Sequence, residues 1–196
     1  DFYKKTGIRK ICLAGGVALN CLTNQKIMDL DFIDNIYVQP ASGDSGISLG
    51  AAMYTSAKVG YKPLPIETAL LGPEFTNEQI LQSLNENKIK YQKIDEPAEI
   101  AAQLIADNKV IGWFQGRMEF GPRALGARSI LANPAMPIVK EIINKKIKFR
   151  ENFRPFCPSV TEEDMKNYFV GKANRAPFMN ITFGTAIKPN KDLTLS

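Results

Sequence analysis

The apolar residues of this chain follow two different spacings. Short continuous apolar runs rich in branched side chains predict strands, at residues 8–14, 35–39, 89–94, 110–114, 129–132 and 178–185. Apolar residues three or four positions apart predict helices, at residues 18–30, 47–59, 97–108, 138–147 and 161–169 and in one more helix that starts at Thr76. Strands and helices alternate along the chain, which is typical of an α/β fold.

Proline and glycine interrupt this alternation once, between Gly60 and Pro73. Two prolines within three residues, Pro63 and Pro65, oppose helix formation. We therefore expect two domains, at residues 1–66 and 67–196. The runs at 8–14 and 110–114 should be buried strands, and the small-residue helix at 47–59 should pack closely against its surroundings.

The composition narrows the functional classes. The chain has 196 residues, 44% of them apolar, which is enough for a core without disulfides. It has no histidine, so Ser-His and Cys-His catalysis are excluded. Three cysteines without close pairing (Cys12, Cys21 and Cys157) predict buried thiols in a reducing cytoplasm. No apolar run approaches the roughly 20 residues that a membrane helix needs.

The positive charge is concentrated in one segment. Between Arg117 and Arg154 lie nine basic and three acidic residues, a net charge of +6 in a chain whose total is +5. Such an excess indicates an anionic ligand. Aromatic residues are not interleaved with these charges in the usual way for nucleic-acid binding, so the pattern disfavours nucleic acid.

Two glycine-rich turns follow predicted strands. Gly15 and Gly16 lie in LAGGVALN, where paired glycines and a helix start could bring backbone N–H groups to an anion. Asp44 lies in ASGDSG among small residues, so its carboxylate is accessible to a metal ion. Two plainer alternatives remain, namely a tight turn without a ligand and an aspartate that caps the next helix.

Two cationic motifs lie in the basic segment. The loop from Gly116 to Ser129 carries Arg117, Arg123 and Arg128, whose guanidinium groups can bind phosphate or carboxylate in a bidentate manner. Further on, KFRENFRP places Lys148 and Arg150 two residues apart, so on an extended stretch they would face the same side. A solvated basic loop and a solvated helix end are the alternatives.

The two glycine turns together resemble the C-terminal lobe of the actin-like ATPase superfamily, in its carbamoyl-transferring branch. The resemblance implies that Gly15, Gly16 and Asn20 contact the nucleotide and that Gly46 contacts a phosphate. It also implies that Asp44 binds a divalent metal, either Fe or Mg.

The run GRMEFGPRALGARSILA, followed by KFRENFRPFCPS, resembles the nodulation and antibiotic O-carbamoyltransferase family. The family's YrdC-like domain makes carbamoyl adenylate from carbamoyl phosphate and ATP, and its actin-like domain passes the carbamoyl group to a hydroxyl. The implied fold is therefore an actin-like lobe segment followed by a partial YrdC-like α/β domain. By position, the implied catalytic residues are Arg123, Lys148, Arg150 and Arg154, and the supporting residues are Arg117, Arg128 and Ser129.

The chain departs from that family in two ways. The family's metal site also uses histidines, which this chain lacks, and its YrdC-like region continues past Ser196. We therefore expect an internal fragment that does not transfer carbamoyl groups by itself. The full-length protein is expected to accept a hydroxyl-bearing small molecule and could form a homodimer. The alternatives are an actin-like kinase or ATPase and a non-catalytic nucleotide-binding module.

Overall fold

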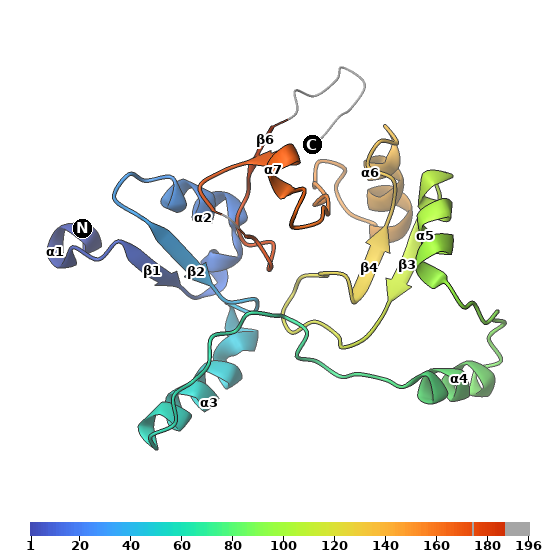
Figure 1. Ribbon diagram of the computed structural model, residues 1–196, viewed down its shortest axis with the longest axis horizontal. Coiled ribbons are helices and arrows are strands. Elements are labelled where there is room, and N and C mark those ends of the chain that lie inside the picture. Colours follow the sequence, from blue (N-terminus) through green and yellow to red (C-terminus); the bar gives the residue numbers. More distant parts are fainter. Residues whose placement is uncertain (174, 187–196) are drawn as a thin grey trace. The chain divides into compact units, whose positions relative to one another are not determined.

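The computed structural model describes residues 1–173 and 175–186 (Figure 1). These residues form two compact units, and each unit is discontinuous in sequence. The first unit contains Asp1–Leu71, Glu119–Leu125 and the described residues from Val160 onward, and the second contains Gly72–Met118 and Gly126–Ser159. The predicted domains, 1–66 and 67–196, are continuous, and residues 187–196 of the second lie outside the described part.

The first unit is built around a parallel pair of strands. β1 (Lys10–Leu13) pairs with β2 (Asn35–Val38), from Lys10 opposite Asn35 to Leu13 opposite Val38. A second, antiparallel pair in the same unit joins β5 (Phe169–Val170) to β6 (Gly184–Thr185). The helical segments are α1 (Phe2–Thr6), η1 (Gly16–Leu19), α2 (Cys21–Met28), η2 (Asp44–Gly46), α3 (Ile47–Lys58) and α7 (Met165–Tyr168).

The second unit contains one antiparallel pair of strands, β3 (Ile111–Phe114) and β4 (Arg128–Leu131). Its helical segments are α4 (Asn77–Glu86), α5 (Pro97–Ala106), α6 (Val139–Ile142) and the π-helix η3 (Ile143–Lys148). α4 starts with a capping box, in which Thr76 and Gln79 bond to each other's backbone N–H groups. The mixed α/β class that the sequence predicts is confirmed.

Several predicted elements differ from the structure. Residues 89–94 form no strand, and Ile89 and Tyr91 are exposed, because no neighbouring strand pairs with them. Within 178–185 only Gly184 and Thr185 are paired. The helix expected at 161–169 is confined to Met165–Tyr168. The helix expected at 18–30 begins at Cys21, because Asn20 caps it.

The core of each unit is small. Met28, Ile33 and Val38 are buried in the first unit, and Ala101 and Ile143 in the second. Two-stranded sheets leave much of their surface uncovered, so the strands expected to be buried are only partly covered.

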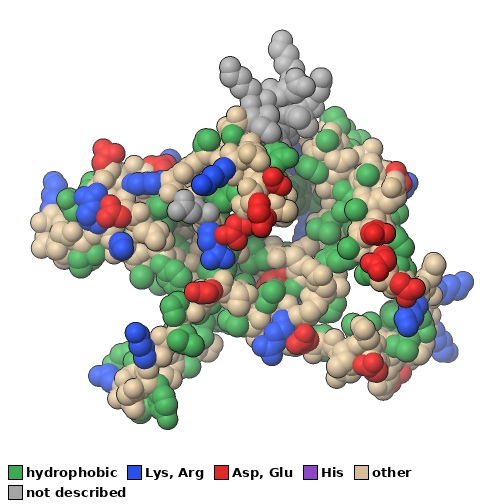
Figure 2. All heavy atoms as spheres, in the orientation of Figure 1, with side chains coloured by type: hydrophobic (Ala, Val, Ile, Leu, Met, Phe, Trp, Pro, Cys, Tyr) green, Lys and Arg blue, Asp and Glu red, His purple; other side chains and the backbone are tan. Residues whose placement is uncertain are grey.

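The prediction that the helix at 47–59 packs closely was wrong. α3 has no buried residue, and the side chain of Ile47 is 67% exposed. Apolar side chains are visible among the charged ones on the face shown in Figure 2. The prediction of buried thiols was also wrong, because Cys12 and Cys157 are exposed and Cys21 is half-buried. Among the described helices, none combines the length and apolar character that crossing a membrane requires.

Candidate functional site

The two glycine turns lie side by side at one edge of the parallel strand pair. Because β1 and β2 are parallel, their carboxyl ends meet at the same edge, and each strand leads into one of the turns. Gly15, with φ of 99°, donates its N–H to the carbonyl of Ser42 at 2.7 Å. Across the turns, a Cβ at Gly43 would lie 3.8 Å from Cα of Gly16. The structure therefore brings together two turns that are about 25 residues apart.

Backbone donors in these turns differ in their availability. Gly16 is exposed, and its N–H makes no hydrogen bond within the described residues. Gly46 is buried and donates its N–H to Gly43 at 3.0 Å. A Cβ at Gly46 would collide with the Ala41 carbonyl, so packing within the loop by itself accounts for a glycine there. Gly16 is thus the better placed of the two to meet an anion.

Two polar residues of the turns, Asn20 and Asp44, have different surroundings. The Asn20 side chain accepts a hydrogen bond from Thr23 N–H at 3.1 Å and so caps α2. Asp44 is exposed at the start of η2, and its carboxylate bonds to no described residue. It therefore does not cap α3, and the capping alternative is wrong. The described residues contain no group of three metal-binding side chains, so Asp44 could supply one ligand only.

A third loop, Glu119–Leu125, belongs to the same unit as the glycine turns. Phe120 donates its N–H to Ala69 at 2.6 Å, and the carboxylate of buried Glu119 accepts the Leu125 N–H at 2.7 Å. Gly121 has φ of 111°, and a Cβ there would lie 2.6 Å from the Pro40 carbonyl. The loop therefore passes directly over the start of the second glycine turn.

Arg123 reaches the first glycine turn from this loop. Its Nη2 donates to the carbonyl of Leu19 at 3.1 Å, at the end of η1. The side chain is half-buried, and the rest of its guanidinium makes no hydrogen bond with the described residues. The sequence grouped Arg123 with Lys148, Arg150 and Arg154. The structure instead places Arg123 in the first unit and those three residues in the second.

The remaining residues of the arginine loop lie in the second unit. Arg117 is exposed and forms an ion pair with Glu74 at 3.7 Å. Arg128 is the exposed first residue of β4, and the Ser129 hydroxyl accepts the Gly126 N–H at 2.9 Å. Ser129 therefore closes the turn that enters β4.

Arg150 of the second unit is held by contacts with Asn144 and Phe156. Its backbone N–H donates to the Asn144 carbonyl at 3.0 Å, and its Nε donates to the Asn144 side chain at 2.7 Å. Its guanidinium carbon lies 4.8 Å from the ring centre of Phe156. These contacts fix the plane of the guanidinium and leave its two terminal nitrogens without a hydrogen bond to any described residue. They are available to an anion.

Lys148 and Arg154 differ from the prediction in their surroundings. Lys148 ends η3, and Phe149 follows in the left-handed conformation with φ of 49°. The stretch from Lys148 to Arg150 is therefore not extended. The argument that two residues on an extended stretch face the same side does not apply here, so that prediction was wrong. Arg154 forms an ion pair with Glu151 at 2.8 Å. An anion that binds Arg154 must therefore compete with Glu151.

Two buried asparagines, one in each unit, hold the loops that carry the candidate residues. Neither belongs to a motif that the sequence marked as a candidate. Asn24 is 1% exposed and Asn144 is fully buried. Asn144 donates to the Arg154 carbonyl at 2.9 Å and accepts from Arg150. A polar residue among the isoleucines of the stripe at 138–147 was the available signal for Asn144. For Asn24 the local sequence offers no comparable signal.

Comparison with known proteins shows that this chain matches the models of one protein family. Residues 1–53 match the model of the carbamoyltransferase N-terminus, and residues 102–194 match the model of the carbamoyltransferase C-terminus. The chain is 45% identical over 185 residues to nodulation protein NolO of Bradyrhizobium diazoefficiens, which covers 90% of this chain and 34% of NolO. It is 40% identical over 191 residues to nodulation protein NolNO of Sinorhizobium fredii, covering 95% and 28%.

An uncharacterized protein of Synechocystis is 42% identical over 177 residues, which covers 85% of this chain and 29% of that protein. The chain thus spans about a third of the length of the relatives that it matches. All three loops of the first unit and the Lys148–Arg154 segment lie inside the matched residues, 1–53 and 102–194.

Proposed function

The chain belongs to the carbamoyltransferase family, and we propose that it is part of an ATP-dependent O-carbamoyltransferase. In the first step, water releases phosphate from carbamoyl phosphate, and the resulting carbamate attacks the α-phosphorus of ATP. Carbamoyl adenylate forms and pyrophosphate leaves. In the second step, a substrate hydroxyl attacks the carbamoyl carbon and AMP leaves.

In this proposal the first unit contributes nucleotide binding and carbamoyl transfer, with an actin-like architecture. The observation that carries this part is the convergence of three loops, through the bonds from Gly15 to Ser42 and from Arg123 to Leu19. Backbone N–H groups and a guanidinium are suited to phosphate oxygens. Gly15, Gly16, Asn20 and Gly46 are the proposed nucleotide and phosphate contacts.

Asp44 is the proposed metal ligand of this unit, for Fe or Mg. An exposed carboxylate without a hydrogen bond to the described residues fits a hard divalent cation, which would neutralise phosphate charge. Because the described residues contain no cluster of further ligand side chains, the proposal assigns the remaining ligands to the rest of the full-length protein.

The second unit contributes the proposed adenylation chemistry, with a YrdC-like architecture. The proposed ligands of this unit for carbamoyl phosphate and the ATP phosphates are Lys148, Arg150 and Arg154, and Arg117, Arg128 and Ser129 support them. Arg123 is proposed as a ligand for the same anions in the first unit. The orientation of Arg150 by Asn144 and Phe156 supports this assignment. Cations held in place stabilise charge that develops on the leaving groups, so the protein need not supply a nucleophile.

Binding measurements on this chain test the proposal. Titration calorimetry with carbamoyl phosphate, and separately with ATP and Mg²⁺, should give heat in both cases. Arg150→Ala should weaken carbamoyl phosphate binding by about tenfold or more, because a charge-assisted hydrogen bond is lost. Lys93→Ala, an exposed lysine of the same unit outside the arginine motifs, is the matched control and should bind like the wild type.

The outcomes separate the competing functions. If the chain binds ATP but not carbamoyl phosphate, and if Arg150→Ala leaves ATP binding unchanged, a kinase or ATPase is favoured. No heat with either ligand would favour a non-catalytic module. The chain alone is expected not to carbamoylate a hydroxyl acceptor, and detection of such a product would refute that expectation. The hydroxyl-bearing acceptor and the homodimer remain proposals for the full-length protein.

A further inference from the structure

The C-terminal segment of the first unit contains a short anchored stretch, Phe178–Asn180. Phe178 is 5% exposed, so its large apolar side chain is buried. Met179 has φ of 52°, a left-handed conformation that is uncommon for a residue with a side chain. Such a conformation persists only where the surroundings hold it. The backbone of this stretch is therefore held in one conformation, which is not the strand that the sequence predicts.

Asn180 and Asn24 connect this stretch to both glycine turns. Asn180 Nδ2 donates to the carbonyl of Val38 at 2.5 Å. The Asn180 carbonyl in turn accepts from Nδ2 of Asn24 at 2.8 Å, and the same Nδ2 donates to the carbonyl of Ala18 at 2.8 Å. An amide nitrogen has two hydrogens, so Asn24 uses both.

The two outer ends of this bridge lie at the turns. Ala18 is within η1, two residues after Gly16. Val38 is the last residue of β2 and leads into the loop that carries Asp44. Two of these three hydrogen bonds join residues more than 140 positions apart. Asn24 is 1% exposed, so water does not easily replace the two bonds that it donates. The bridge therefore adds a second connection to the one that the Gly15–Ser42 bond makes between the turns.

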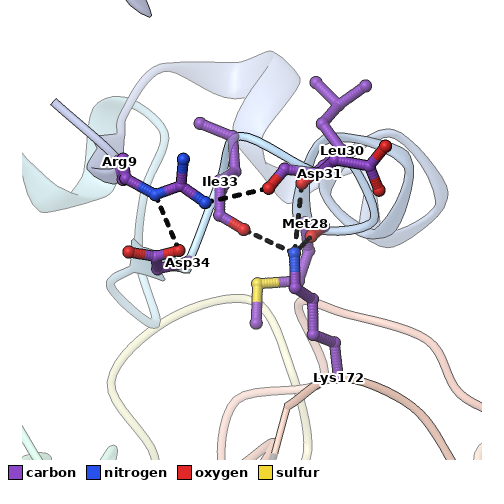
Figure 3. Close-up of polar contacts among 7 residues, drawn as sticks. All are labelled: Arg9, Met28, Leu30, Asp31, Ile33, Asp34 and Lys172. Carbon is purple, nitrogen blue, oxygen red and sulfur yellow. Dashed lines mark hydrogen bonds and ion pairs between the residues drawn. The ribbon is translucent and has the colours of Figure 1, made fainter. Parts of the chain in front are cut away.

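Lys172 attaches the same segment at a second place (Figure 3). Its Nζ donates to the carbonyls of Met28, Leu30 and Ile33, at 3.1, 3.1 and 2.5 Å. These carbonyls lie at and just after the C-terminal end of α2, where the helix dipole favours a cation. Figure 3 also shows Arg9, which bonds Asp34 and the Asp31 carbonyl in the same turn. The segment is therefore attached to the middle of α2 through Asn24 and to its C-terminal end through Lys172.

We propose that Asn24 and Asn180 are positioning residues for the two glycine turns, so that the segment from Val160 to residue 186 controls ligand binding in the first unit. The inference rests on the proposed function, because it takes the turns to be the nucleotide site. Neither side chain needs to touch the nucleotide. Each holds a backbone carbonyl, and together they set the spacing between Gly16 and Asp44.

Hydrogen exchange and ATP binding on the 196-residue chain test this role. The variants Asn24→Ala and Asn180→Asp remove donors, and Asn180→Asp does so without changing the side chain's shape. Exchange of the Gly15 N–H should become about tenfold faster, since a buried carbonyl loses its partner. Amides of α4 and β3, in the second unit, should keep their protection.

The affinity for ATP with Mg²⁺ should fall by about tenfold in both variants under conditions where each is fully folded. Asn180→Gln keeps an amide donor and should fall between the wild type and Asn180→Asp, which a purely space-filling role would not produce. Asn167→Ala is the matched control. Asn167 lies in α7 of the same segment and, among the described residues, its side chain bonds only to Asp164, so exchange and affinity should not change.

Unchanged protection of Gly15 in both variants would overturn the proposal, and so would equal acceleration of exchange in the two units, which indicates global unfolding. Unchanged ATP affinity in variants whose turns exchange faster would also overturn it. If the wild-type chain does not bind ATP, the nucleotide assignment of the proposed function fails. In that case the exchange of Gly15 alone decides whether the two asparagines position the turns.

Discussion

The loops of the two units are held in different ways. In the first unit the loops also contact one another directly through their backbones: Gly15 bonds Ser42, and Gly121 packs against the Pro40 carbonyl. In the second unit the candidate cations are held by side chains. Arg154 pairs with Glu151, and Arg150 bonds Asn144.

This difference has consequences for ligand binding. A loop held by backbone contacts at close range cannot shift without moving the chain, so the glycine turns are already shaped before a ligand arrives. An exposed ion pair contributes little to stability and exchanges readily with a bound anion. Arg154 can therefore exchange Glu151 for a bound anion.

The largest expected effect tests the backbone contacts of the first unit. Gly46→Ala would place a methyl group against the Ala41 carbonyl and the Gln39 amide. We expect a loss of about 3 kcal/mol in the free energy of unfolding, because backbone must move to admit the group. Urea unfolding followed by circular dichroism measures it.

Gly50→Ala is the matched control for this change. Gly50 lies inside α3, and a Cβ there meets no atom within 4 Å. Alanine should stabilise the helix by about 0.5–1 kcal/mol. If Gly46→Ala were as harmless as Gly50→Ala, the loop at residues 40–46 would be mobile rather than preformed.

The next largest effect tests the buried amide of the second unit. Asn144→Ala removes the acceptor of Arg150 and the donor to Arg154. We expect a loss of about 2 kcal/mol in the free energy of unfolding, because buried partners become unsatisfied. Fluorescence of Trp113, the only tryptophan of the chain, reports this unit. The exposed Asn85→Ala should change little, and equal effects of the two variants would contradict the prediction.

A smaller effect is expected from the exposed ion pair. Both side chains of the Arg154–Glu151 pair are about half exposed, at 52% and 55%. Glu151→Gln should therefore change the free energy of unfolding by no more than about 0.5 kcal/mol. It should also tighten phosphate binding, because Arg154 loses its competitor. Glu162→Gln, which breaks a similar pair with Arg175 in the first unit, is the control. A loss above about 2 kcal/mol in either variant would show that surface pairs hold the loops firmly.

The smallest effect concerns pH and the first unit. Removal from water, with a further contribution from Cys12, raises the pKa of Tyr37. The protonated form is thus favoured in the folded state. The stability it contributes should be present below the ordinary tyrosine pKa and lost as pH rises through the raised value. Urea midpoints at about pH 8 and about pH 11 measure this, and Tyr37→Phe should show less alkaline loss than the wild type.

Local sequence features predicted local structure well. The strands β1 to β4 lie within one or two residues of their predicted positions, and the Thr76 capping box is present as predicted. These features depend on residues close together in the chain. The expected strands at 89–94 and 178–185 failed because a strand needs a partner, and the apolar pattern of one segment does not identify it.

The sequence did not predict which of the candidate site residues lie in the same unit. Arg123 is surrounded in the chain by residues of the arginine motif, yet it bonds Leu19, which is 104 positions away. The seven residues Glu119–Leu125 cross into the first unit and return, and no local pattern marks that crossing.

By itself, the sequence determined the α/β class, the two glycine turns, the basic segment with its net charge of +6, and the family to which these motifs belong. Only the tertiary structure decided which cations share a unit with the turns and which side chains hold them. The reason is physical: turns and helix caps follow from neighbouring residues. The partners of a buried amide such as Asn24, however, are chosen by where distant parts of the chain meet.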